Sequence, residues 1–83
     1  MTIELLSKPN CVQCTATKKA FDKNETAYTV TDVTQDEAAL ALAKGLGYLS
    51  APVVVVRDAA GDIINHFAGF QPEKIKALSA VLV

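Results

Sequence analysis

The two cysteines of this 83-residue chain, Cys11 and Cys14, are separated by two residues. An apolar run ending at Leu6 precedes them, Ser7 to Asn10 has the composition of a turn, and helix-compatible residues follow from Thr15. We therefore expect the pair at a strand-to-helix junction, where unpaired N–H groups and the helix dipole stabilise a thiolate. This spacing lets two sulfurs alternate between a disulfide and a dithiol.

The Cys-x-x-Cys spacing has three interpretations. A structural zinc site needs four ligands and a catalytic one needs three plus water, whereas the chain adds only His66 and carboxylates to its cysteines. We therefore expect no metal site within one chain. Two buried structural cysteines would more often be isolated than paired at the start of a helix. Redox use is the interpretation that the context favours.

Length and composition limit the remaining possibilities. Residues 1–83 make one small domain, and a hydrophobic fraction of 51% is enough for a core. The net charge of −1 gives no footprint for nucleic acid or an anionic membrane. No apolar stretch reaches the roughly 18 residues of a spanning helix, and no signal-peptide pattern is present. We expect a cytoplasmic monomer that binds neither nucleic acid nor membrane.

Apolar periodicity and turn residues predict alternating strands and helices. We expect strands over 3–6, 26–33, 53–56 and 63–67, and helices over 14–24, 37–46 and from Pro72 onward. Thr34 is the expected N-cap of the second helix, with Glu37 completing a capping box. The order β-α-β-α-β-β-α predicts an α/β fold, a four-stranded mixed sheet flanked by three helices. The cysteines then lie at the carboxyl end of the first strand.

Within the redox interpretation the two cysteines have different roles. Cys11 lies at the loop edge and is the expected nucleophile, whereas Cys14 lies inside the first helical turn and is the expected resolving thiol. Val12 and Gln13 should shape access to Cys11 and tune the reduction potential. Lys8 either lowers the pKa of the Cys11 thiol or is an ordinary solvated lysine.

Four residues outside the cysteine motif have assignments. Pro52 opens a strand, and its peptide bond is either cis or that of a simple strand-start proline. Phe67 fits the core at a strand end. Phe70 follows a glycine in a loop and suits a surface contact. His66 fits an exposed strand position.

Four runs of sequence form a recognisable set. They are Lys8-Pro9-Asn10-Cys11-Val12-Gln13-Cys14, Leu46-Gly47-Tyr48-Leu49, Ala51-Pro52-Val53-Val54 and Ala68-Gly69-Phe70-Gln71-Pro72-Glu73. Together they resemble the NrdH-redoxins, the glutaredoxin-like hydrogen donors of ribonucleotide reductase, over about Ile3 to Leu78. The resemblance implies a thioredoxin fold with Pro52 cis beside Cys11. It also implies that the backbone of Ala51 offers strand-like hydrogen bonds to a bound partner.

The resemblance further implies partners and an electron route. Electrons would come from NADPH through a flavin-containing thioredoxin reductase and pass to ribonucleotide reductase, with no cofactor bound to this chain. Glutathione-binding glutaredoxins have a Gly-Gly pair where this chain has Gly69 and Phe70. The tripeptide groove should therefore be less open, and these two residues should contact the protein partner. The family's usual Trp-Ser-Gly-Phe-Arg-Pro is Phe67-Ala68-Gly69-Phe70-Gln71-Pro72 here.

Two alternatives to this redoxin function stay open on the sequence. One is a glutathione-dependent glutaredoxin, and the other is a non-enzymatic thioredoxin-like module that binds a partner or holds a metal between two chains. A colorimetric zinc or iron assay separates the module from the enzymes. The choice of electron donor separates the two enzymes.

Overall fold

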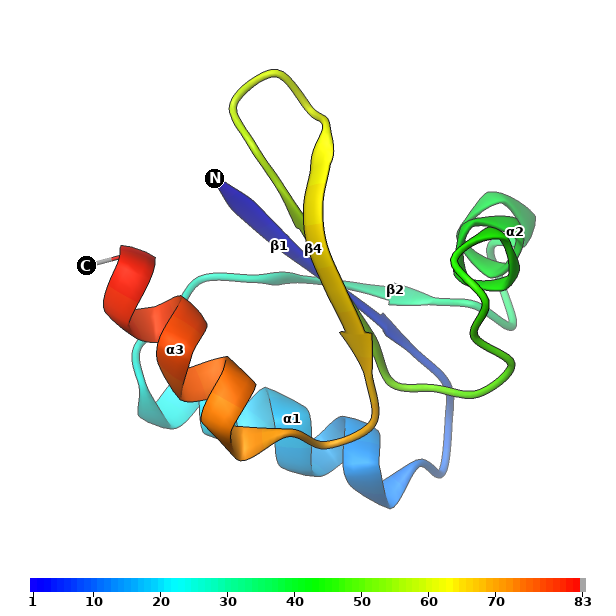
Figure 1. Ribbon diagram of the computed structural model, residues 1–83. Coiled ribbons are helices and arrows are strands. Elements are labelled where there is room, and N and C mark those ends of the chain that lie inside the picture. Colours follow the sequence, from blue (N-terminus) through cyan, green and yellow to red (C-terminus); the bar gives the residue numbers. More distant parts are fainter. Residues whose placement is uncertain (83) are drawn as a thin grey trace.

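A four-stranded mixed sheet is the centre of the structure (Figure 1). The structure is a computed structural model that describes the backbone of residues 1–82 and the side chains of residues 1–80. The elements, in chain order, are β1 Thr2–Ser7, α1 Val12–Lys23, β2 Thr29–Asp32, α2 Glu37–Gly45, β3 Val53–Arg57, β4 Ile63–Ala68 and α3 Pro72–Leu82. The predicted fold class and element order are confirmed, and the differences lie at element ends. Among residues 1–82, no helix is both long enough and apolar enough to cross a membrane.

The sheet has the order β2-β1-β3-β4, with β1 and β3 in its middle. β1 runs parallel to β2 and antiparallel to β3, and β3 and β4 form an antiparallel hairpin. The four valines at the start of β3 are all buried. Since successive strand side chains point to opposite faces, Val54 and Val56 belong to one hydrophobic cluster and Val53 and Val55 to another.

The helices cover the two faces of the sheet unequally (Figure 1). α1 and α3 lie on one face, and the cluster there consists of Ile3, Leu5, Phe21, Val54, Val56, Phe67, Ile75 and Leu78. α2 covers the other face through a smaller cluster of Leu6, Ala39, Ala43, Val53 and Val55. Phe67 is 2% exposed, so its assignment to the core is confirmed.

The connection from α1 to β2 differs from the prediction of a strand starting at Thr26. The N–H of Glu25, which has a left-handed φ of 55°, bonds the carbonyl of Asp22 at 3.0 Å. The N–H of Thr26 bonds the carbonyl of Phe21 at 2.9 Å, which completes a Schellman motif. The Thr26 hydroxyl lies 2.6 Å from that of Ser79 in α3. Thr26 is therefore part of the helix end, and β2 begins later.

The start of α2 also differs from the prediction. Its N-cap is Asp36, whose carboxylate accepts a hydrogen bond from the N–H of Ala39 at 3.0 Å. Thr34, the predicted cap, donates its hydroxyl and its N–H to Oδ1 of Asp32 at 2.6 and 2.8 Å. These two hydrogen bonds hold the pKa of Asp32 below its ordinary value, and the bond from the hydroxyl has the larger effect. The carboxylate of Asp32 is a charged acceptor, and hydrogen bonds to charged acceptors are the stronger ones. Thr34 is therefore bonded to the end of β2, and Asp36 is the N-cap of α2.

The buried hydroxyl pair of Thr26 and Ser79 provides a test of how α3 is held. Ser79 also donates to the carbonyl of Ile75 at 3.0 Å. Thr26→Val and Ser79→Ala should each lower the free energy of unfolding by about 1–2 kcal/mol, because each removes a partner of a buried polar group. The double variant should lose less than the sum, since the shared bond is lost once. Urea unfolding measures all three, with the exposed Thr2→Val as control, and strict additivity would contradict the coupling.

Candidate active site

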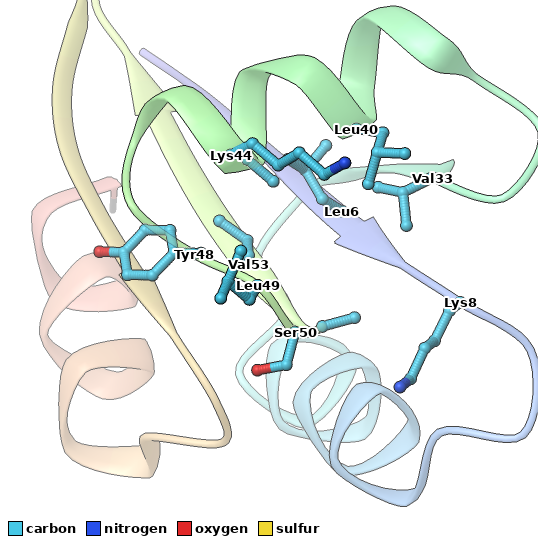
Figure 2. Close-up of a pocket in the computed structure, with 11 residues that line it drawn as sticks. Leu6, Lys8, Val33, Leu40, Lys44, Tyr48, Leu49, Ser50 and Val53 are labelled. Carbon is cyan, nitrogen blue, oxygen red and sulfur yellow. The ribbon is translucent and has the colours of Figure 1, made fainter.

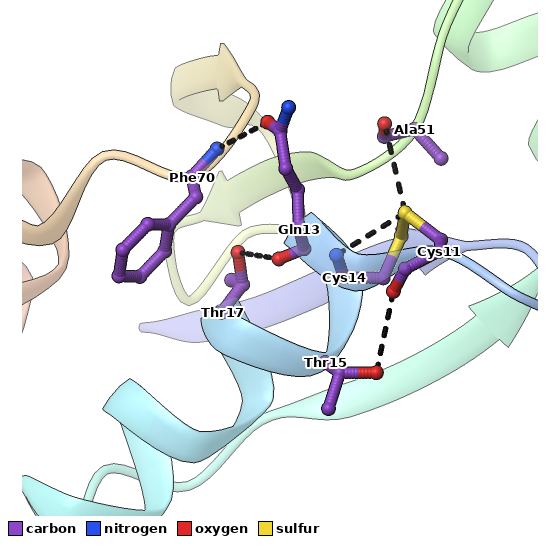
Figure 3. Close-up of a disulfide and its surroundings, with 7 residues drawn as sticks. All are labelled: Cys11, Gln13, Cys14, Thr15, Thr17, Ala51 and Phe70. Atoms are coloured by element: carbon purple, nitrogen blue, oxygen red, sulfur yellow. Dashed lines mark hydrogen bonds between the residues drawn. A yellow bond between two sulfur atoms is a disulfide. The ribbon is translucent and has the colours of Figure 1, made fainter.

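The cysteines lie where the turn after β1 passes into α1 (Figure 3). A disulfide joins Cys11 to Cys14, and their Cα atoms are 5.2 Å apart. Cys11 is the N-cap of α1, which begins at Val12 and not at Cys14 as predicted. The reason is that Sγ of Cys11 accepts a hydrogen bond from the N–H of Cys14 at 3.2 Å, the bond that a Ser, Thr or Asp oxygen makes at most N-caps. Both intervening residues therefore belong to the first helical turn.

The two sulfurs differ in exposure and in electrostatic environment. Cys14 is 1% exposed, whereas Cys11 is half-buried at the surface. The first N–H groups of a helix have no partner within the helix, and its N-terminus favours negative charge. Cys11 caps this end, so its sulfur lies where the helix favours negative charge. The geometry makes Cys11 the sulfur that a second molecule can reach.

The loop before β3 lies beside Cys11. The carbonyl oxygen of Ala51 is 3.9 Å from Sγ of Cys11 (Figure 3). The Ala51–Pro52 peptide bond is cis, as the resemblance implies. Pro52 is buried, and its carbonyl accepts a hydrogen bond from the N–H of Gly69 at 2.9 Å. This bond holds the loop after β4 next to the loop before β3.

Gln13 joins the cysteine motif to the loop after β4, a contact that the sequence did not predict. Its side-chain Oε1 accepts a hydrogen bond from the N–H of Phe70 at 3.1 Å (Figure 3). Gly69 has a left-handed φ of 79°, and a Cβ there would lie 3.3 Å from the same oxygen. Gln71 holds the loop as well, because its Nε2 donates to the carbonyl of Ala68 at 2.8 Å. The loop is thus bonded both to the cysteine motif and internally.

Exposed apolar side chains come from three segments around the site. Val12 is 84% exposed and Phe70 is 40% exposed. The ring of Phe70 points away from the disulfide (Figure 3). Leu49, in the loop before β3, is 92% exposed, and the sequence did not predict it as a site residue. Several apolar side chains exposed around one site are typical of a surface that contacts another protein.

Lys8 lines two hollows near the cysteines. One is an open hollow that Cys11 and Cys14 also line. The other, of about 200 Å³, lies between α2 and the loop before β3, with Lys8 and Tyr48 among its lining residues (Figure 2). Lys8 is exposed, and between the described side chains of Lys8 and Cys11 the structure has neither a hydrogen bond nor an ion pair. Its positive charge therefore lies beside the site without a direct contact to the sulfur.

His66 is not the exposed strand residue that the sequence predicted. It is half-buried, and its Nδ1 lies 2.8 Å from the hydroxyl of Tyr48. The two rings also meet edge to face, with centroids 5.5 Å apart. This pair joins β4 to the loop after α2. Within the described part of the chain, no three His, Cys, Asp or Glu side chains converge as metal ligands.

Gly69 and Gly45 form a matched pair for testing the loop after β4. Gly69→Ala should lower the free energy of unfolding by about 1–2 kcal/mol, because a side chain at this left-handed position is strained and would press on Gln13. Gly45→Ala, in α2 with nothing within 4 Å of the new Cβ, should stabilise by about 0.5–1 kcal/mol. Urea unfolding measures both, and an equal sign for the two variants would contradict the prediction.

Comparison with known proteins places this site in a family. The family model described as Glutaredoxin matches residues 3–59. The glutaredoxin-like protein NrdH of Salmonella typhimurium is 32% identical over 78 residues, which cover 94% of this chain and 89% of that protein.

Solved structures agree with the sequence comparison. The NrdH-redoxin of Escherichia coli superimposes with a TM-score of 0.82 at 28% identity, covering 94% of this chain and 95% of that one. The thioredoxin-like protein BC3987 gives a TM-score of 0.74 at 35% identity, covering 93% and 99%. With its Cys11–Cys14 disulfide, the protein is a thiol-disulfide oxidoreductase of the thioredoxin fold. The chain belongs to the glutaredoxin family and, within it, to the NrdH-redoxins.

Proposed function

We propose that this redoxin carries electrons from thioredoxin reductase to ribonucleotide reductase through the Cys11–Cys14 pair. The observation that carries the proposal is the accessible Cys11 at the N-terminus of α1, 3.9 Å from the carbonyl of Ala51. In this route NADPH and the flavin belong to the reductase, and the redoxin binds no cofactor of its own. We further propose that the redoxin acts as a monomer and that it acts in the cytoplasm, because a reversible dithiol suits a reducing compartment.

The proposed reaction starts from the dithiol form. The Cys11 thiolate attacks one sulfur of the partner's disulfide, so that bond breaks and the other partner sulfur leaves as a thiolate. Cys14, after losing its proton, attacks Sγ of Cys11 and breaks the mixed disulfide, which releases the second partner thiolate. The partner gains two electrons and, after protonation, two thiols, while the redoxin becomes the disulfide. Thioredoxin reductase then returns two electrons to the redoxin.

The backbone beside Cys11 supports a protein substrate. The carbonyl of Ala51 faces the sulfur, so an extended segment on either side of a partner's cysteine can hydrogen-bond to this backbone. Val12 in α1 and Leu49 in the loop before β3 add exposed apolar side chains. We infer that Lys8, on the same surface, favours the thiolate and attracts an anionic partner.

The loop after β4 supports thioredoxin reductase over glutathione as the electron donor. The N–H of Phe70, a donor that a tripeptide carboxylate would need there, is already bonded to Gln13. The ring of Phe70 points away from the cysteines, so the Gln13 amide and not the ring limits access in this proposal. The similar NrdH-redoxin of Escherichia coli has been described as having a thioredoxin-like activity profile.

A coupled assay tests the electron donor. NADPH oxidation is followed with insulin as the disulfide substrate, either with thioredoxin reductase or with glutathione and glutathione reductase. We expect turnover with thioredoxin reductase and at least about ten-fold slower turnover with glutathione, a difference of about 1.4 kcal/mol. Turnover with glutathione alone would overturn the proposed donor.

Gln13→Ala sharpens the same assay. The substitution frees the N–H of Phe70, so the ratio of glutathione-linked to reductase-linked turnover should rise. Gln71→Ala is the matched control. It removes the other side-chain amide that holds the loop after β4, and it leaves the N–H of Phe70 bonded to Gln13. An equal rise in both variants would assign the effect to loop loosening and not to the Gln13 hydrogen bond.

Serine variants test the roles of the two cysteines. Cys11→Ser should reduce turnover to the rate without redoxin, because a hydroxyl does not replace the attacking thiolate. Cys14→Ser should accumulate a mixed disulfide with the partner, since nothing resolves it. Intact-protein mass spectrometry after a single turnover detects this adduct. Equal residual activity in both variants, or an adduct on Cys14 in the Cys11→Ser protein, would contradict the assignment.

A further inference from the structure

A groove between α1 and α3 concentrates positive charge next to the redox site. Its lining includes Ala16, Lys19, Lys23, Phe70, Pro72 and Lys76, and its volume is about 640 Å³. The alanines, Phe70 and Pro72 make it apolar, and the three lysines are exposed. No acidic side chain of the described residues lines it, although the whole chain has nine acidic residues against eight basic ones. The groove is therefore a local basic surface on a slightly acidic protein.

The lysines of this groove have no carboxylate partner within the described side chains. Among residues 1–80 the ion pair is that of Arg57 with Glu4, on the sheet. Asp22, the acidic residue of α1, accepts a hydrogen bond from the Tyr28 hydroxyl at 3.1 Å. An exposed set of like charges with no internal partner attracts a segment of opposite charge and speeds its association.

Phe70 connects the groove to the cysteines. Its side chain lines the groove, while its N–H is bonded to Gln13 between the two cysteines. Figure 3 shows the ring directed away from the disulfide. Lys19 and Lys23 follow along α1, which puts them about 12 and 18 Å from Cys11 along the helix axis at the rise of an α-helix. An extended chain covers that distance in about four to six residues.

We propose that this groove binds an extended acidic segment of the disulfide-bearing partner, located about four to six residues from the partner's cysteine. Carboxylates of the segment pair with Lys19, Lys23 and Lys76, and an apolar side chain between them packs on Phe70. The inference rests on the proposed function, since it names the kind of protein whose disulfide Cys11 reduces. The groove selects the partner, and the cysteines carry out the exchange.

Two synthetic disulfide peptides test the groove. Both contain a Cys-x-x-x-Cys disulfide, followed after four residues by Glu-Glu-Leu-Glu in one and by Gln-Gln-Leu-Gln in the other. The reduced protein should reduce the acidic peptide about three- to ten-fold faster at low salt, as expected for two or three exposed ion pairs. Added salt at about 0.5 M should remove most of this preference. If both peptides are reduced, equal rates at low salt would overturn the proposal.

Charge variants locate the effect. Lys23→Gln/Lys76→Gln should lose most of the preference for the acidic peptide. Lys44→Gln/Lys74→Gln removes the same charge from residues outside the groove and should keep the preference. A preference that survives in the groove variant, or disappears equally in the control variant, would refute the groove as the binding surface.

A binding measurement separates this inference from the proposed function. Labelled peptides with serine in place of both cysteines are titrated with the oxidised protein, and fluorescence anisotropy reports binding without any redox step. Tighter binding of the acidic peptide, lost in Lys23→Gln/Lys76→Gln, supports the groove even if no peptide is reduced. Absence of reduction of both disulfide peptides would count against the proposed function, whereas equal binding of the two serine peptides would count against the groove.

Discussion

The hydrogen bond from the N–H of Cys14 to Sγ of Cys11 is the interaction on which the site depends. It makes a sulfur the N-cap of α1, so the helix starts one residue after Cys11. One sulfur consequently stays at the surface, at the positive end of the helix dipole, and the other lies in the first turn among buried residues. The packing of Phe21 against the sheet fixes the direction of α1, and with it the position of both sulfurs.

Two loops that are distant in sequence complete the site around this cap. The loop before β3 brings the carbonyl of Ala51 to Cys11, and the loop after β4 is bonded to Pro52 through Gly69. Gln13 connects the cysteine motif to that second loop. The site is therefore a junction of three segments. A backbone hydrogen bond joins the two loops, and the side chains of Cys11 and Gln13 join the cysteine motif to them.

Local sequence patterns predicted the architecture but not the competition between caps. Element order, the strand of valines at 53–56 and the core position of Phe67 follow from periodicity and apolar content, which act over a few residues. The predicted helix cap at Thr34 and the predicted strand start at Thr26 were wrong, because each of these threonines had more than one possible hydrogen-bond partner within reach. Thr34 bonds the carboxylate of Asp32, and Thr26 meets Ser79 from the far end of the chain. Propensity alone does not rank such partners.

The sequence by itself determined the redox pair, its place before a helix and the family resemblance, because these depend on spacing and on motifs read along the chain. The tertiary structure decided which groups come together: Gln13 meets the N–H of Phe70, Tyr48 meets His66, and lysines of α1 and α3 line one groove. Each of these arrangements brings together segments that are separated in the chain. Their formation depends on how the helices pack on the sheet, and packing is set by the whole core and not by any one segment.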